Sequence, residues 1–178
     1  MRLLTLVLSL LFFTGCASLP SGETYLDETP AFNLEQFFAG KVKAYGIVQG
    51  RDGEVFQRFT VDINGTVDGD TITLDETFTY GIGDGPKKRI WTIVKQADGT
   101  YTGTAGDVAT VARGEIFGNA FYFGYEMDLP VDDTSYRVKF DDWMWAFDES
   151  ALMNRSYIRK FGITFAEVTI FMLKEPVS

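Results

Sequence analysis

Two charged residues, Glu76 and Arg89, each stand among apolar residues on one face of a strand-like run of the sequence. A glycine-rich turn at residues 83–85 joins the two runs and predicts a β-hairpin. With Tyr80 opposite Lys87, Glu76 and Arg89 fall on the same apolar face as diagonal neighbours. A buried carboxylate is costly unless it is paired, so this register predicts an ion pair between them. Such a pair could anchor the head group of a ligand, or it could only close one end of the fold.

Asp107 is the only charged residue in the run Thr104–Ala112, whose other side chains are small. If this run is a strand, its inner face leaves room for one small ligand. Large neighbours could instead fill that room, and the next apolar run, around Tyr125, is rich in aromatic residues. Trp91 would share the inner face with Arg89. We therefore take Asp107, Tyr125 and Trp91 as further candidates for a ligand pocket.

Asp141 and Asp142 stand beside Trp143 in a third aromatic run. A carboxylate against an aromatic surface can have a raised pKa and act as a general acid. Adjacent residues of a strand point to opposite faces, so the two carboxylates share one substrate only across a bulge. Asp141 and Trp143 are candidates for the ligand pocket, and packing in the core is the alternative reading.

The composition excludes several kinds of chemistry. The chain has no His, which removes the Ser-His-Asp triad, His-ligated zinc and haem with a proximal His. It has 16 Lys and Arg against 25 Asp and Glu, a poor balance for binding nucleic acid. We expect no metal, no cofactor and no nucleic-acid partner. An enzyme would have to work with carboxylates, Lys, Tyr or hydroxyl groups, as glycosidases do with two carboxylates.

The N-terminus is typical of an exported lipoprotein. Residues 1–15 combine a positive start, a short apolar stretch and a final Thr-Gly, and Cys16 follows directly. This pattern predicts a signal peptide over 1–15 and lipid on Cys16, the only Cys, as the link to a membrane. Ala17 after the lipidated Cys favours the outer membrane, facing the periplasm. Polar residues through position 31 predict a tether, and residues 32–178 one domain.

The elements that must position these residues are mostly strands. Residues 33–38 predict a short helix capped by Asn33. Beyond residue 40 apolar residues recur with period two, most clearly over 121–129, and turn dipeptides separate the runs. Short connections predict an all-β fold, an antiparallel up-and-down barrel of about eight to ten strands, with a sandwich as the alternative. Residues 149–157 lack alternation and predict a short helix or a loop.

Sequence blocks along the chain resemble two known groups of proteins. Residues 38–42 are similar to the N-terminal motif of lipocalins, with Val42 in place of the usual Trp. A wider resemblance is to the bacterial lipoprotein family catalogued as domain of unknown function 3833. Its blocks here are Leu74–Phe78, Arg89–Trp91, Gly103–Val108, Gly118–Ala120, Phe140–Met144 and Met153–Arg155. The resemblance implies an envelope lipoprotein with a lipocalin-like barrel, and it supplies no catalytic residues.

Three classes of function fit these observations. The first is binding of a small apolar ligand in the barrel, such as a fatty acid or another lipid. The second is a carboxylate-dependent enzyme that acts on envelope lipid or glycan. The third is a structural or assembly factor that contacts other envelope proteins through an exposed apolar patch.

The anchoring hypothesis predicts that Cys16→Ser abolishes lipid modification, because no other thiol is present. The variant should leave the membrane fraction, since a stable anchor needs the acyl chains. Mass spectrometry of the mature N-terminus and membrane fractionation measure the two effects. A Cys16→Ser chain that is still lipidated and retained would contradict the hypothesis.

Overall fold

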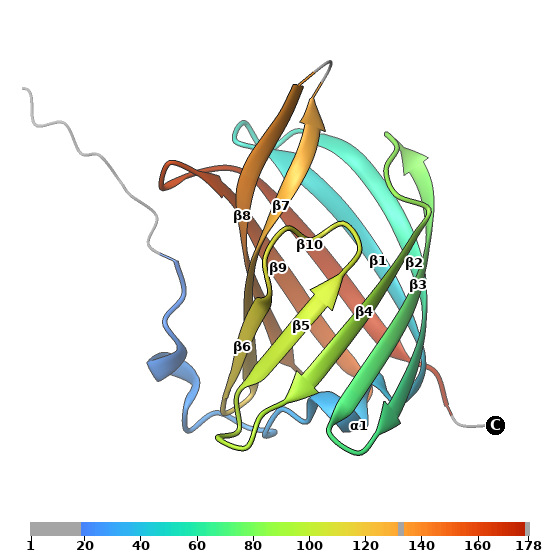
Figure 1. Cartoon of the computed structure of the whole chain (residues 1–178), viewed down its shortest axis with the longest axis vertical. Helices are drawn as coiled ribbons and strands as arrows, with labels where there is room; N and C mark the ends of the chain where they lie inside the picture. Colours follow the sequence, from blue (N-terminus) through green and yellow to red (C-terminus); the bar gives the residue numbers. More distant parts are fainter. Residues whose placement is uncertain (1–18, 132–133, 177–178) are drawn as a thin grey trace, which may run out of the picture.

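The computed structural model describes residues 19–131 and 134–176, and ten antiparallel strands form a closed barrel in it (Figure 1). Each strand pairs with the next in sequence, and β1 closes the ring by pairing with β10. The strands are β1 (Gly40–Gly50), β2 (Val55–Asp68), β3 (Thr71–Ile82), β4 (Lys88–Lys95), β5 (Tyr101–Ala105), β6 (Ala112–Phe117), β7 (Ala120–Val131), β8 (Thr134–Ala146), β9 (Ala151–Lys160) and β10 (Ile163–Lys174). The predicted up-and-down barrel is therefore confirmed, and the sandwich is excluded.

Alternation of side chains separates the lumen from the outer wall of the barrel. Along β7 the odd-numbered residues from Phe121 to Met127 are buried, and the residues between them are partly exposed. β1 shows the same pattern, with Val42 and Ala44 buried and Tyr45 half exposed. Because successive side chains of a strand point to opposite faces, the buried set of each strand faces the lumen. Hydrophobic burial along all ten strands thus builds one central core.

A short helix, α1 (Leu34–Phe38), closes one end of the barrel, at the bottom in Figure 1. The Asn33 side chain accepts a hydrogen bond of 2.8 Å from the backbone N–H of Gln36, as expected for an N-cap. Lys174 Nζ, from the end of β10, donates to the carbonyl oxygens of Gln36 and Phe37 at 2.9 and 3.0 Å. A cation at these carbonyls satisfies the C-terminal end of the helix. The prediction of a capped helix is confirmed.

The apolar side chains of α1 close this end tightly. Leu34, Phe37 and Phe38 are each at most 4% exposed. A side chain at Gly65 of β2 would meet the Phe38 carbonyl oxygen at 1.8 Å, so only glycine allows the helix to lie this close. Large aromatic side chains also fill the lower lumen, because Phe123 occupies the space that a side chain at Gly103 would take. The alternative of a lumen filled by large neighbours holds at this end.

Two local predictions were wrong. Residues 149–157 do not form a helix or loop, because most of them belong to β9, which alternates between buried and partly buried positions along its length. The alternation is hidden in the sequence because polar Asn154 and Ser156 face inward while Met153 and Tyr157 face outward. The run Thr104–Ala112 is not one strand either.

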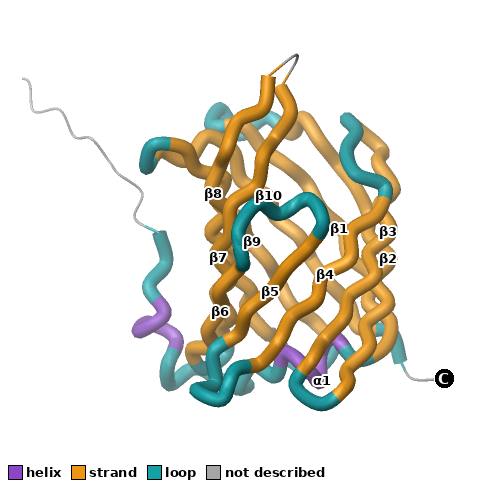
Figure 2. The backbone as a smooth tube through the Cα atoms, viewed as in Figure 1, coloured by secondary structure: helices purple, strands orange, loops and turns teal. Residues whose placement is uncertain are grey.

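Instead, β5 ends at Ala105 and β6 begins at Ala112, and a loop over residues 106–111 lies between them (Figure 2). The loop lies against β7: Val108 forms an isolated bridge with Met127, and Ala109 N donates to the Glu126 carbonyl at 2.8 Å. The strands β5 and β6 pair over only three residue pairs. The upper part of the wall between β4 and β7 is therefore covered by a loop rather than by strands.

The described part of the predicted tether lies along the outer wall. A 3-10 turn, η1 (Gly22–Tyr25), brings Tyr25 onto Trp143 and Trp145, with ring centroids 5.9 and 6.0 Å apart. The backbone N–H of Phe32 donates to the Gly118 carbonyl at 2.8 Å. The predicted signal peptide over 1–15 and Cys16 lie outside the described residues. Among the helices that the structure describes, none is both long and apolar enough to cross a membrane.

Candidate functional site

Glu76 and Arg89 face each other directly across β3 and β4. The predicted parity is confirmed, since both residues share the inner face with Trp91, which is 6% exposed. The predicted register was wrong by two residues, because the β3–β4 ladder ends at Thr77 opposite Lys88 and Tyr80 is not opposite Lys87. The connection is longer than a tight hairpin.

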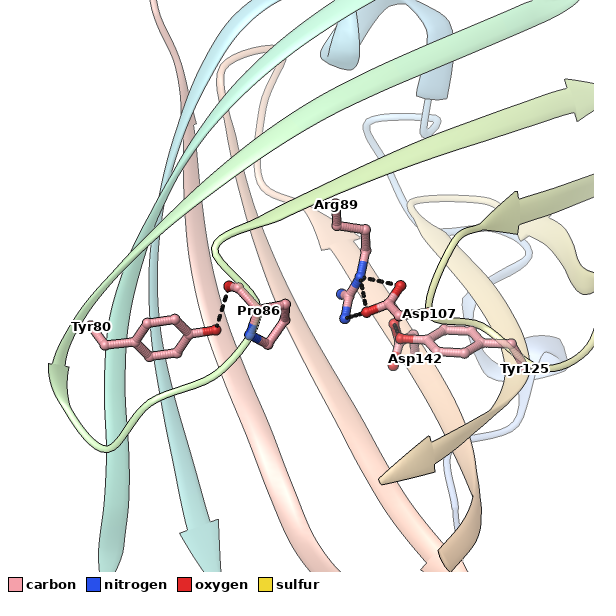
Figure 3. Close-up of polar contacts among 6 residues, drawn as sticks. All are labelled: Tyr80, Pro86, Arg89, Asp107, Tyr125 and Asp142. Atoms are coloured by element: carbon pink, nitrogen blue, oxygen red, sulfur yellow. Dashed lines mark hydrogen bonds and ion pairs between the residues drawn. The ribbon is translucent and has the colours of Figure 1, made fainter. Parts of the chain in front are cut away.

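Pro86 is one reason for the longer connection, since it has no N–H to donate to a ladder. Its carbonyl instead accepts a hydrogen bond of 3.1 Å from the hydroxyl of Tyr80 (Figure 3). β3 continues past this point to Ile82, paired only with β2. Tyr80 thus stays on the inner face, near the open end of the barrel.

Arg89 pairs with Asp107 and not with Glu76, so the predicted ion pair is corrected. Arg89 Nε lies 3.0 and 2.9 Å from the two carboxylate oxygens of Asp107, and Nη2 lies 2.6 Å from one of them (Figure 3). This fork-to-carboxylate geometry is the one that guanidinium groups favour. Burial, the largest single effect, would lower the pKa of Arg89, but the hydrogen bonds to Asp107 and the nearby charges of Tyr125, Glu76 and Asp107 together outweigh it and raise the pKa. The pair holds the loop over residues 106–111 against β4.

Glu76 is left without a partner of its own. The structure records no hydrogen bond or ion pair to its carboxyl group among the residues it describes. Burial raises the pKa of Glu76 to about 7, and the nearby charge of Arg89 opposes this shift only in part. Asp107 and Asp142 raise the pKa further, because like charges disfavour ionisation.

Asp142 supplies a second carboxyl group with unused hydrogen-bonding capacity. It is 8% exposed and faces the lumen from β8. Tyr125 donates its hydroxyl to Asp142 Oδ2 at 3.1 Å, whereas the buried Oδ1 has no donor among the described residues. Ser156 lies directly opposite on β9, and its hydroxyl makes a long hydrogen bond of 3.4 Å to Asn154 Oδ1 while it also favours the ionised form of Asp142. Burial raises the pKa of Asp142 to about 6, against the opposing effect of Ser156 and Tyr125.

These groups form one cluster, which we call the lumenal charge cluster: Glu76, Arg89, Asp107, Tyr125 and Asp142. Aromatic rings surround it, since Tyr125 stacks on Phe140 at 5.1 Å and meets the edge of Trp91 at 5.2 Å. The five residues come from four different strands and one loop, and only the closed barrel brings them together.

The lumen beyond the cluster is in contact with solvent. Several inward-facing side chains keep partial exposure although they lie inside the ring of strands: Glu76, Phe78, Tyr80, Arg89, Leu129 and Ile170. At the helix end, by contrast, the inward side chains Val42, Ile63, Ile72 and Leu74 are at most 4% exposed. The barrel therefore has a filled end and an accessible end, and the charge cluster lies between them.

Two candidate residues lie outside the lumen. Asp141 faces the outer wall, where it accepts hydrogen bonds from Tyr122 at 2.6 Å and Arg159 at 3.2 Å and pairs with Lys139 at 2.8 Å. Trp143 also faces outward and is covered by Tyr25. Both are buried because the N-terminal segment and neighbouring side chains cover this wall, and not because they face a pocket. Sequence parity already separated Asp141 from Asp142, but it could not tell which one faces inward.

A groove of about 600 Å³ lies on the opposite part of the molecule, over β1, β2, β3 and β10. Most of the side chains that line it point outward, including Tyr45, Ile47 and Phe171. Cross-strand pairing places Tyr45 directly beside Phe171. No signal in the sequence singled out this groove, because most of its residues occupy outward positions on four strands that only the closed barrel brings side by side. No group of three or more potential metal ligands occurs in the described part of the chain.

Comparison with known proteins adds a family and a fold. The family described as "Protein of unknown function (DUF3833)" matches residues 10–174. The chain belongs to this family. No curated protein matches it. Among solved structures, this DUF3833 chain is similar to the S-type phycobiliprotein lyase CPES from Guillardia theta, with a TM-score of 0.56 and 10% identity over 83% of this chain and 95% of that chain. The likeness shows a shared lipocalin-like barrel.

The geometry of the cluster predicts an unequal response to removing either partner of the Arg89–Asp107 pair. Arg89→Met leaves several carboxyl groups together without a cation, so it should lower the free energy of unfolding by about 1–2 kcal/mol. Asp107→Asn should cost less, because Arg89 can then turn to Glu76 directly opposite. Urea unfolding of both variants measures the difference. A larger loss in Asp107→Asn would contradict the arrangement.

The raised pKa of Glu76 predicts a specific dependence of stability on pH. The folded chain holds a proton on Glu76 up to about pH 7, whereas the unfolded chain releases it near the ordinary value of 4.5, so folding loses stability as pH rises between these values. Glu76→Gln removes this loss. Between about pH 5 and about pH 8, the free energy of unfolding of the native chain should therefore fall by about 2 kcal/mol more than that of the variant. Thermal or urea unfolding at both pH values tests it. A Glu115→Gln control, on the outer face of β6, should show no such difference.

Proposed function

We propose that this chain is an envelope lipoprotein, held on the outer membrane by lipid on Cys16, whose barrel binds a small apolar ligand or lipid in its lumen. The observation that carries the proposal is the half-open lumen. Its inward side chains keep contact with solvent around two carboxyl groups: among the described residues, no hydrogen bond reaches that of Glu76, and no donor reaches Oδ1 of Asp142. Ligand sites are typically apolar hollows with a few convergent polar groups, and this lumen has both.

The shared architecture supports this proposal. The similar solved structure is a phycobiliprotein lyase, and a lipocalin-like barrel of this size has room for one small molecule beside its core. The filled end matters as much as the open one, because α1 and the aromatic residues beneath the cluster give a ligand a rigid floor. An apolar body would lie among Phe78, Tyr80 and Ile170, with its polar end toward Glu76.

Two other functions each have one observation in their favour. The raised pKa values of Glu76 and Asp142 would suit proton transfer, as in a carboxylate-dependent enzyme. The outer groove would suit an envelope protein partner, since apolar side chains line it. The lumen is preferred because it joins apolar walls and unsatisfied polar groups in one place.

The proposal predicts where an uncharged apolar probe binds. With the full chain carrying Cys16→Ser, N-phenyl-1-naphthylamine should bind and gain fluorescence. Ile170→Trp fills the open part of the lumen and should weaken binding about tenfold or more. The control Phe171→Trp, one residue along the same strand, points into the outer groove and should leave binding unchanged. If only Phe171→Trp weakens binding, the groove is the site, and no binding at all would overturn the proposal.

A further inference from the structure

The charges inside the lumen are unbalanced. Three carboxyl groups, those of Glu76, Asp107 and Asp142, surround the single guanidinium of Arg89. Asp107 takes up Arg89 Nε and Nη2 in a two-pronged pair. A group that approaches the cluster therefore meets two carboxyl groups, those of Glu76 and Asp142, that form no ion pair with any residue in the described ranges.

Asp142 indicates which kind of chemical group a ligand would bring to the cluster. Its Oδ1 is buried within a side chain that is 8% exposed, and no donor in the described part of the chain reaches it. A buried acceptor without a donor costs free energy, on the order of 1–3 kcal/mol, that a ligand with a suitable donor recovers. Neighbouring Tyr125 already gives its only hydroxyl proton to Oδ2. The missing partner is thus a hydrogen-bond donor.

The aromatic wall nearby also accepts cations. Arg89 Cζ lies 5.6 Å from the centre of the Phe78 ring, and Lys87 Nζ lies 5.3 Å from that of Tyr80. Both rings face the accessible part of the lumen and stack on each other at 6.2 Å. Positive charge over an aromatic face is favourable, most of all where water is excluded. These two ring faces already hold the protein's own cations, so the groups left to receive a further cation are the carboxyl groups of the cluster.

We infer that the ligand of this barrel carries a cationic hydrogen-bond donor, of the primary ammonium class, on an apolar body, and that Glu76 and Asp142 receive it. This inference rests on the proposed lumenal binding and makes it more specific. A carboxylate head group, as in a fatty acid, would instead face two carboxyl groups of its own sign, with Arg89 already engaged.

The binding should depend on pH through the groups that face the ammonium. These are Glu76, Asp142, the Arg89–Asp107 pair, and the neutral hydroxyls of Tyr80 and Tyr125, with Lys87 at the rim. Protonation of Glu76 and Asp142 removes the negative charge that attracts the ligand. Ammonium binding should therefore weaken as pH falls from about 8 to about 5.

Isothermal titration of the full chain carrying Cys16→Ser with three ligands of one chain length, decylamine, decanol and decanoate, tests the inference. At about pH 8 decylamine should bind at least about tenfold more tightly than decanoate, and more tightly than decanol. Glu76→Gln with Asp142→Asn should abolish the preference for decylamine and leave decanol binding intact. The control Glu115→Gln, whose exposed side chain points outward from β6, should keep the preference.

The outcomes separate this inference from the function on which it rests. Decanoate or decanol binding as tightly as decylamine overturns the ammonium head group while lumenal binding stands. Failure of all three, together with failure of N-phenyl-1-naphthylamine, overturns lumenal binding itself. If the double variant does not fold, the test uses the Cys16→Ser chain only. The order of the affinities for decylamine, decanol and decanoate, and its change with pH, then decides whether the inference holds.

Discussion

Closure of the sheet is the constraint on which the rest of this structure depends. Nine residue pairs join β1 to β10, from Val42 opposite Lys174 to Gly50 opposite Ala166. Closure gives each strand a partner on both sides over at least part of its length, and it directs alternate side chains of all ten strands into one lumen. The lumen must be either filled by side chains or lined with side chains that are stable in contact with water. One end of this barrel is filled, and the other is open to solvent.

At the end closed by α1, large side chains fill the lumen. α1 lies across the opening, glycines at Gly65 and Gly103 let large neighbours approach, and the inward residues have almost no contact with solvent. Dense packing of this kind gives the hydrophobic stabilisation that a chain without disulfides needs in this part of the fold. It also allows the middle of the lumen to carry charge, because the free-energy cost of the unsatisfied carboxyl groups is small beside the free energy gained by burying apolar side chains below them.

The lumenal charge cluster is the feature that packing alone does not explain. A barrel built only for stability would replace Glu76 and Asp142 by apolar residues, since well-packed apolar groups are often at least as stable as buried charges. Their raised pKa values, near 7 and 6, record the free energy that the fold gives up to keep them. The cluster lies between a filled end and an accessible end, and this position supports the proposal that it binds a ligand. The loop over residues 106–111, fixed by the Arg89–Asp107 pair, completes the wall at the same level.

The sequence by itself determined the class of fold, the capped helix and the parity of most strands, because these follow from local spacing: period two, turn dipeptides and an Asn at a helix start. Parity was enough to place Glu76 and Arg89 on one face, even though the register was wrong by two residues. Where inward positions are polar, as at Asn154 and Ser156, spacing carries no signal, and β9 was missed. Only the tertiary structure decided that Arg89 binds Asp107, that Asp142 and not Asp141 faces inward, and that Trp143 is covered by Tyr25. Each of these depends on groups distant in sequence, whose distances and directions are set when the ring of strands closes.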